Sequence, residues 1–102
     1  MKLVRDYIPD IIESAGKTCD WHWVSDQQEH MNYLKLKILE EVDEFIENPC
    51  LEEAADILEV LKAFVDLNGF NFDEVNKAAK DKAIKRGSFK AGIVLERVDD
   101  DK

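Results

Sequence analysis

Acidic residues recur at one-turn spacing in the middle of the chain, where they could hold a divalent cation. The segment 39–45 reads Leu-Glu-Glu-Val-Asp-Glu-Phe and contains Glu40, Glu41 and Glu44, and Glu53 and Asp56 follow three residues apart. Carboxylate oxygens suit hard ions such as Mg²⁺ and Mn²⁺, which keep several waters and often bind substrate phosphates at the same time. The chemistry predicted by these residue types is therefore that of a phosphoryl-transfer site.

Helical geometry indicates which of these carboxylates face inward. At about 100° per residue, Glu41 lies beside the apolar stripe of its helix and Glu44 at the margin of that stripe. On the next helix, Glu53 lies inside the apolar arc and Asp56 at its border. A tight turn between residues 48 and 49 would bring the two pairs together in a rough quadrilateral between the helices.

Such a cluster predicts a bound cation. At an effective dielectric near 20 and about 5 Å separation, each ionised pair would repel by roughly 3 kcal/mol, which is large for a marginally stable small domain. The alternative is that these acid-rich helices simply present a solvated face.

The elements that position the carboxylates are mainly helical. A short helix is expected from near Pro9 to Gly16. A capping box formed by Ser25 and Gln28 predicts a long helix to about residue 48. Asn48 with Pro49 is expected to start the second long helix, which closes at residues 68–69. A third long helix is expected from Asn71, where Glu74 completes another capping box, to Gly87.

Two segments have β-strand character. Residues 18–24 alternate around Cys19, Trp21 and Trp23, which predicts a half-buried strand. The β-prone tail around Ile93 is expected to pair with the Trp21 strand. The expected fold class is thus mainly α: a helical bundle with a central antiparallel helix hairpin and a small β accessory from the Trp21 and Ile93 segments.

Composition limits the functional class. The chain has 102 residues with a formal net charge of −9, which predicts a single domain over residues 1–102 and disfavours a nucleic acid polymer as partner. No apolar run approaches a membrane span or a signal peptide, so a cytoplasmic protein without membrane contact is expected. Cys19 and Cys50 fit neither a zinc site nor a CxxC pair and are expected to be reduced thiols.

The acidic motif resembles that of a known enzyme superfamily. Glu40-Glu41-Val42-Asp43-Glu44 followed by Glu53-Ala54-Ala55-Asp56 is similar to the EExxE and ExxD signature of the MazG-like all-α nucleoside triphosphate pyrophosphohydrolases. The flanking segments 2–9 and 86–89 look like the ends of a small branch related to phosphoribosyl-ATP pyrophosphohydrolase. The resemblance therefore spans nearly the whole chain.

The resemblance implies a reaction and a set of residue roles. It implies Mg²⁺-dependent hydrolysis, with Mn²⁺ as a possible substitute, between the α- and β-phosphates of a nucleotide to give a nucleoside monophosphate and pyrophosphate. The residues that match the metal ligands are Glu41, Glu44, Glu53 and Asp56. Glu40 matches the first glutamate of the signature and could act as an outer-shell acceptor or orient the attacking water, although the helical geometry points it away from the apolar stripe. Glu40 and Glu41 are the predicted catalytic residues.

Phosphate groups also need positive partners, and four cationic side chains are candidates. They are Lys2 and Arg5 near the start of the chain, and Lys82 and Arg86 one helical turn apart late in the third long helix. Arg5, Lys82 and Arg86 are taken as the predicted phosphate-binding residues. Only eight residues separate Glu44 from Glu53, an interval that looks shorter than in most of the family, so the hairpin is expected to be tight.

Two alternatives and one assembly state complete the prediction. The chain could hydrolyse phosphoribosyl-ATP, or it could be a non-catalytic helical binding or regulatory module that keeps the carboxylates for a structural ion or a basic partner. Long helices with broad apolar stripes in so short a chain predict a homodimer or homotetramer, which the family resemblance also implies.

Overall fold

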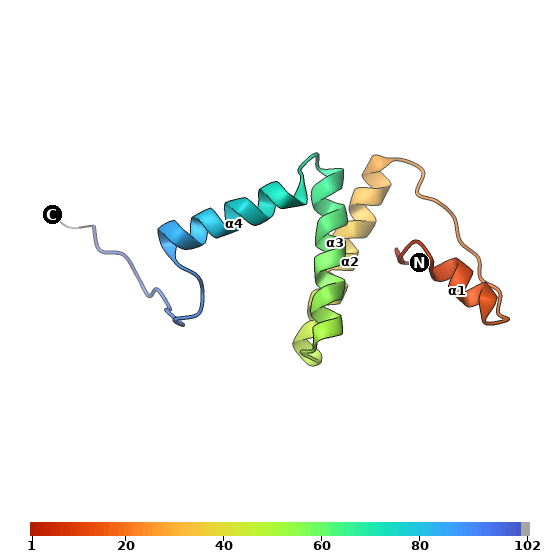
Figure 1. The fold of residues 1–102 in the computed structure, drawn as a ribbon, viewed down its shortest axis with the longest axis horizontal. Helices are drawn as coiled ribbons and strands as arrows, with labels where there is room; N and C mark the ends of the chain where they lie inside the picture. Colours follow the sequence, from red (N-terminus) through yellow and green to blue (C-terminus); the bar gives the residue numbers. More distant parts are fainter. Residues whose placement is uncertain (101–102) are drawn as a thin grey trace. The chain divides into compact units, whose positions relative to one another are not determined.

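The computed structural model describes residues 1–100 and contains four helices: α1 (Ile8–Ser14), α2 (Gln27–Glu47), α3 (Leu51–Leu67) and α4 (Phe72–Arg86) (Figure 1). The expected all-α class is confirmed. The chain divides into two compact units, residues 1–70 and residues 71–102, which are described separately. A single domain over residues 1–102 remains a prediction.

The first unit is built on α2 and α3, which pack against each other (Figure 1). The start of α2 lies beside the end of α3, since the Gln27 side-chain amide donates a hydrogen bond to the Leu67 carbonyl at 3.1 Å. At the other end, the helices are joined through Asn48, Pro49 and Cys50. Leu34 on α2 is 1% exposed and is the one fully buried apolar residue among those described.

The helix boundaries follow the expected positions, but the caps differ in detail. Asp26, rather than Ser25, caps α2, because its side chain accepts a hydrogen bond from the Glu29 backbone N–H at 2.8 Å. Ser25 instead donates to the Glu29 carboxylate through its backbone N–H at 3.3 Å and its hydroxyl at 3.2 Å. Asp26 and Glu29 therefore have the spacing of a capping box one residue later than predicted, but the Glu29 carboxylate accepts from Ser25 instead of from the Asp26 backbone N–H.

The start of α3 also differs from the expectation. Cys50 occupies the N-cap position and makes no side-chain cap hydrogen bond, whereas Asn48 is the C-cap of α2. Pro49 lies between the helices and cannot continue α2, because it has no backbone N–H to donate. A three-residue connection results, centred on Pro49 instead of between residues 48 and 49.

The second unit contains α4, whose start and end agree with the expectation. The Asn71 side chain caps it by accepting from the Asp73 N–H at 2.7 Å, and the helix ends before Gly87, which has a φ of 87°. That left-handed backbone conformation costs glycine little.

The predicted β accessory does not form. Within residues 1–100, neither the Trp21 segment nor the Ile93 segment is a strand. A strand needs a partner for its backbone N–H and C=O groups, and alternation of side chains alone does not provide one. The Trp21 and Trp23 rings instead meet edge to face, with centroids 4.9 Å apart. No helix formed by residues 1–100 has both the length and the apolar character needed to span a bilayer.

Candidate metal centre

Three of the predicted metal ligands converge between α2 and α3. One carboxylate oxygen from each of Glu41, Glu53 and Asp56 lies within 4.8 Å of the other two. Glu41 comes from α2, and Glu53 and Asp56 come from successive turns of α3. We call these three residues the acidic cluster. Its donor set is all oxygen, which fits Mg²⁺ or Mn²⁺ rather than a thiolate- or imidazole-binding metal.

Two oxygens of the acidic cluster are buried without a hydrogen-bond partner. Glu41 is 6% exposed, and its Oε2 atom accepts no hydrogen bond. Glu53 Oε2 is likewise buried and unpartnered. Because an ionised carboxylate oxygen is costly to remove from water without compensation, these atoms are suited to a cationic ligand.

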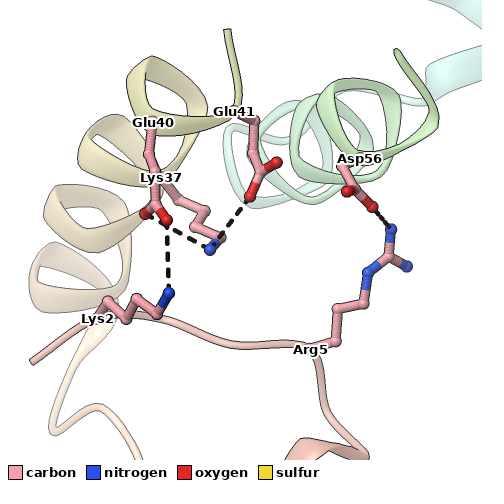
Figure 2. A network of polar contacts seen from close by, with 6 residues as sticks. All are labelled: Lys2, Arg5, Lys37, Glu40, Glu41 and Asp56. Carbon is pink, nitrogen blue, oxygen red and sulfur yellow. Dashed lines mark hydrogen bonds and ion pairs between the residues drawn. The ribbon is translucent and has the colours of Figure 1, made fainter. Parts of the chain in front are cut away.

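Lys37 holds the other oxygen of the buried carboxylate. Its Nζ atom lies 3.2 Å from Glu41 Oε1 and 3.5 Å from Glu40 Oε2, and its side chain is only 15% exposed. Figure 2 shows the ammonium between the two carboxylates, with the second Glu41 oxygen pointing toward α3. Sequence reasoning missed Lys37, although a lysine four residues before a glutamate on one helix is a recognisable ion-pair spacing.

The N-terminal segment brings two further cations to the same region (Figure 2). Arg5 donates through a guanidinium nitrogen to Asp56 Oδ1 at 2.6 Å, and Lys2 Nζ lies 3.5 Å from Glu40 Oε1. The hydrogen bond to Asp56 raises the pKa of Arg5 above its ordinary value, with further attraction from Glu59 and Glu41. Arg5 therefore stays charged at any accessible pH.

A cleft of about 640 Å³ opens between the N-terminal segment and the two helices. Its lining combines cationic, acidic and apolar side chains. It includes Lys2, Arg5, Lys37, Glu41, Asp56, Tyr7, Ile8, Val60 and Ala63. The volume lies in the range typical of small-molecule sites, and the acidic cluster contributes two of its three members to the wall.

The remaining predicted site residues do not belong to the acidic cluster in the described chain. Glu44 is exposed and lies outside this cluster. Three residues advance a helix by about 300°, so Glu44 is displaced by about 60° from Glu41 around α2, toward solvent. Glu40 is half-buried and pairs with Lys2 and Lys37. Lys82 and Arg86 are exposed residues of α4 in the second unit.

Comparison with known proteins adds no further constraint to this geometry. No protein-family model, no curated protein and no solved structure matches the chain.

Proposed function

We propose that the protein is a Mg²⁺-dependent nucleotide pyrophosphohydrolase that cleaves a nucleoside triphosphate between its α- and β-phosphates. The observation that carries the proposal is the acidic cluster, in which Glu41, Glu53 and Asp56 bring carboxylate oxygens within 4.8 Å of one another. Two of its oxygens, Glu41 Oε2 and Glu53 Oε2, are buried and accept no hydrogen bond, which suits them to ligate a cation. The scaffold is the proposed antiparallel hairpin of a MazG-like bundle.

The chain's residues have distinct roles in this proposal. The acidic cluster holds the ion, which when bound supplies an acidic water and neutralises charge on the phosphates. Glu44 could ligate through an intervening water, since it is one turn from Glu41. Glu40, held by Lys2 and Lys37, is the candidate for orienting the attacking water.

The cleft supports a nucleotide-sized ligand. The cationic side chains of Lys2, Arg5 and Lys37 line the same 640 Å³ space as apolar residues such as Val60. Anionic phosphates would lie near the cations and the cluster, and a base or sugar against the apolar wall. The phosphate-binding roles expected of Lys82 and Arg86 remain sequence predictions.

The internal ion pairs favour a second candidate function. Lys37 and Arg5 already pair with Glu41 and Asp56, so the chain partly neutralises its own cluster. A non-catalytic binding module would need only these ion pairs to keep the carboxylates in the fold. It predicts that the cluster can be neutralised by mutation without loss of function and with unchanged or higher stability.

The proposed assembly is a homodimer or homotetramer. Leu36, Leu39 and Ile46 on α2 are 64%, 62% and 68% exposed, and Leu51 at the start of α3 is 84% exposed. With Leu34 the one fully buried apolar residue described, much of the apolar surface of the helices needs another partner. A second copy of the chain would cover it.

The deciding experiment measures pyrophosphate release from a panel of nucleoside triphosphates and phosphoribosyl-ATP in the presence of Mg²⁺. Glu53→Gln removes one member of the acidic cluster, and Glu52→Gln is the matched control on the exposed side of α3. We expect release by the wild type and by Glu52→Gln, with a loss of at least a hundredfold in Glu53→Gln. No release from any nucleotide by the folded wild type would contradict the proposal and support the binding module.

A further inference from the structure

The N-terminal segment makes an ion pair with each helix of the candidate centre. Lys2 pairs with Glu40 of α2, and Arg5 pairs with Asp56 of α3. Residues 1–5 belong to no helix, so this segment is held near the helices by side-chain contacts rather than by the helical hydrogen-bond pattern. Arg5 thus reaches a member of the acidic cluster from a segment outside the helices, just before α1, where the Arg5 carbonyl accepts a hydrogen bond from the Ile8 N–H at 3.1 Å.

The contacts of Arg5 resemble those of a substitute for a cation. Its guanidinium lies 2.6 Å from Asp56 Oδ1, and it is drawn electrostatically toward Glu41 as well. A divalent ion bound to Asp56 would lie within a few ångströms of this guanidinium, and two positive groups at that distance repel strongly. Arg5 contacts only Oδ1 of Asp56, so the conflict between the two cations is electrostatic: each weakens the binding of the other to the acidic cluster.

Lys37 and Arg5 both form ion pairs with the acidic cluster in the described part of the chain, and Arg5 is the more exposed of these two. Lys37 is fixed to a helix, is 15% exposed, and occupies only Oε1 of Glu41. Arg5 has a side chain that is 55% exposed and a backbone outside any helix. A released Arg5 would still line the cleft, where it could pair with an anionic ligand.

We propose that Arg5 is an internal counter-ion that a divalent cation displaces from Asp56, and that this displacement frees its guanidinium to bind a phosphate group in the cleft. The inference rests on the proposed function, because it takes the acidic cluster to be a cation site. It adds an order of events: the cation binds first, and anion binding by Arg5 depends on it. Arg5 is a positioning and binding residue in this scheme.

If Arg5 competes with the cation for Asp56, removing the Arg5 side chain should raise the affinity of the protein for the cation. A purely structural role of Arg5 predicts no such gain. An exposed ion pair must be broken before the cation binds, and such a pair is worth enough to weaken the affinity by about two- to fivefold. Arg5→Gln should therefore bind Mn²⁺ about two- to fivefold more tightly than the wild type, measured without nucleotide by the resonance signal of free Mn²⁺. Lys2→Gln removes a neighbouring charge that does not touch the acidic cluster, and should change the affinity less.

A second measurement follows the released side chain directly. Trypsin cuts after arginine only when the side chain is free to enter its pocket, so Mg²⁺ should accelerate cleavage after Arg5 severalfold. The acceleration should disappear in Glu53→Gln, which weakens the cation site without touching Arg5. Circular dichroism of each variant is the control, and it should show the wild-type helix content.

The outcomes separate this inference from the proposed function. The inference alone would be overturned by two results together. The wild type would bind Mn²⁺ and Arg5→Gln would bind it equally or more weakly, and Mg²⁺ would have no effect on cleavage after Arg5. Absence of Mn²⁺ binding in both proteins would overturn the cation site and the proposed function with it. Binding by Arg5→Gln but not by the wild type would support the inference in its strongest form.

Discussion

The unpartnered buried oxygen of Glu41 makes Glu41→Gln the most informative single change in the chain. The substitution keeps the shape of the side chain and removes its charge. Repulsion from Glu53 and Asp56 at up to 4.8 Å amounts to about 3 kcal/mol for each pair at an effective dielectric of 20. Attraction to Lys37 at 3.2 Å amounts to about 5 kcal/mol on the same scale.

These terms nearly offset in the cation-free protein. Removing the charge of Glu41 relieves its repulsion from Glu53 and Asp56 and loses its attraction to Lys37. The net change in electrostatic energy is therefore within about 2 kcal/mol. The new amide can also donate a hydrogen bond to a neighbouring carboxylate oxygen that has no partner. We therefore expect Glu41→Gln to fold and to have a melting temperature close to that of the wild type, or above it, when no divalent cation is present.

A saturating cation should separate the two proteins. At a concentration of about 100 times Kd, a ligand stabilises the native state by about 2.7 kcal/mol, which raises Tm by roughly 10–20 °C in a domain of this size. If loss of a buried charged ligand weakens binding at least tenfold, the stabilisation of Glu41→Gln falls to about half or less. The assay is thermal unfolding by far-UV circular dichroism with and without Mg²⁺, at constant ionic strength and protein concentration.

Glu52→Gln serves as the control, because it removes an exposed carboxylate from α3 that lies outside the acidic cluster. It should keep the full Mg²⁺ shift of the wild type. A Mg²⁺ shift in Glu41→Gln as large as in the wild type would refute the reasoning, since it would place the ion elsewhere. A wild-type Tm that does not respond to Mg²⁺ or Mn²⁺ would refute it as well.

Three further predictions concern the scaffold. Leu34→Ala should lower the free energy of unfolding by about 2–4 kcal/mol in urea titrations, because Leu34 is 1% exposed, whereas a loss below 1 kcal/mol would mean that this site is not a core position. Asp26→Ala removes the N-cap of α2 and should lower the free energy of unfolding by about 1 kcal/mol in the same assay. Ser25→Ala should lower it less, because the Ser25 hydroxyl bonds the Glu29 carboxylate and not a free helix N–H. The wild type should sediment as a dimer or tetramer at micromolar concentration, and Leu39→Glu should sediment as a smaller species. A monomeric wild type would contradict the proposed assembly.

Most of the helical framework could be predicted from residue patterns, because its signals are local. The starts and ends of the helices depend on capping and breaking residues such as Asp26, Pro49 and Gly87, which act within a few positions of themselves. The errors in the helix caps were shifts of one residue at α2, from Ser25 to Asp26, and of two residues at α3, from Asn48 to Cys50. The strand around Trp21 failed because a strand requires a remote partner that alternation does not specify.

The candidate centre was predictable where helical periodicity alone decides position. Glu41, Glu53 and Asp56 face the opposite helix because each lies within or beside an apolar stripe. Glu44 lay at the margin of its stripe, and periodicity does not determine on which side of such a margin a side chain falls. The ion pair between Arg5 and Asp56 joins residues 51 positions apart, so no local sequence pattern predicts it.

The short connection between α2 and α3 affects the kinetics of folding as well as the geometry of the site. All three members of the acidic cluster lie between residues 41 and 56, and the chain between the helices is only Asn48, Pro49 and Cys50. Closing so small a loop has a low entropic cost, so contacts across it are expected to form early in folding. Interactions already present in the transition state change the folding rate more than the unfolding rate. A cation held by these carboxylates would therefore act chiefly by accelerating folding, as a nucleus around which the two helices assemble.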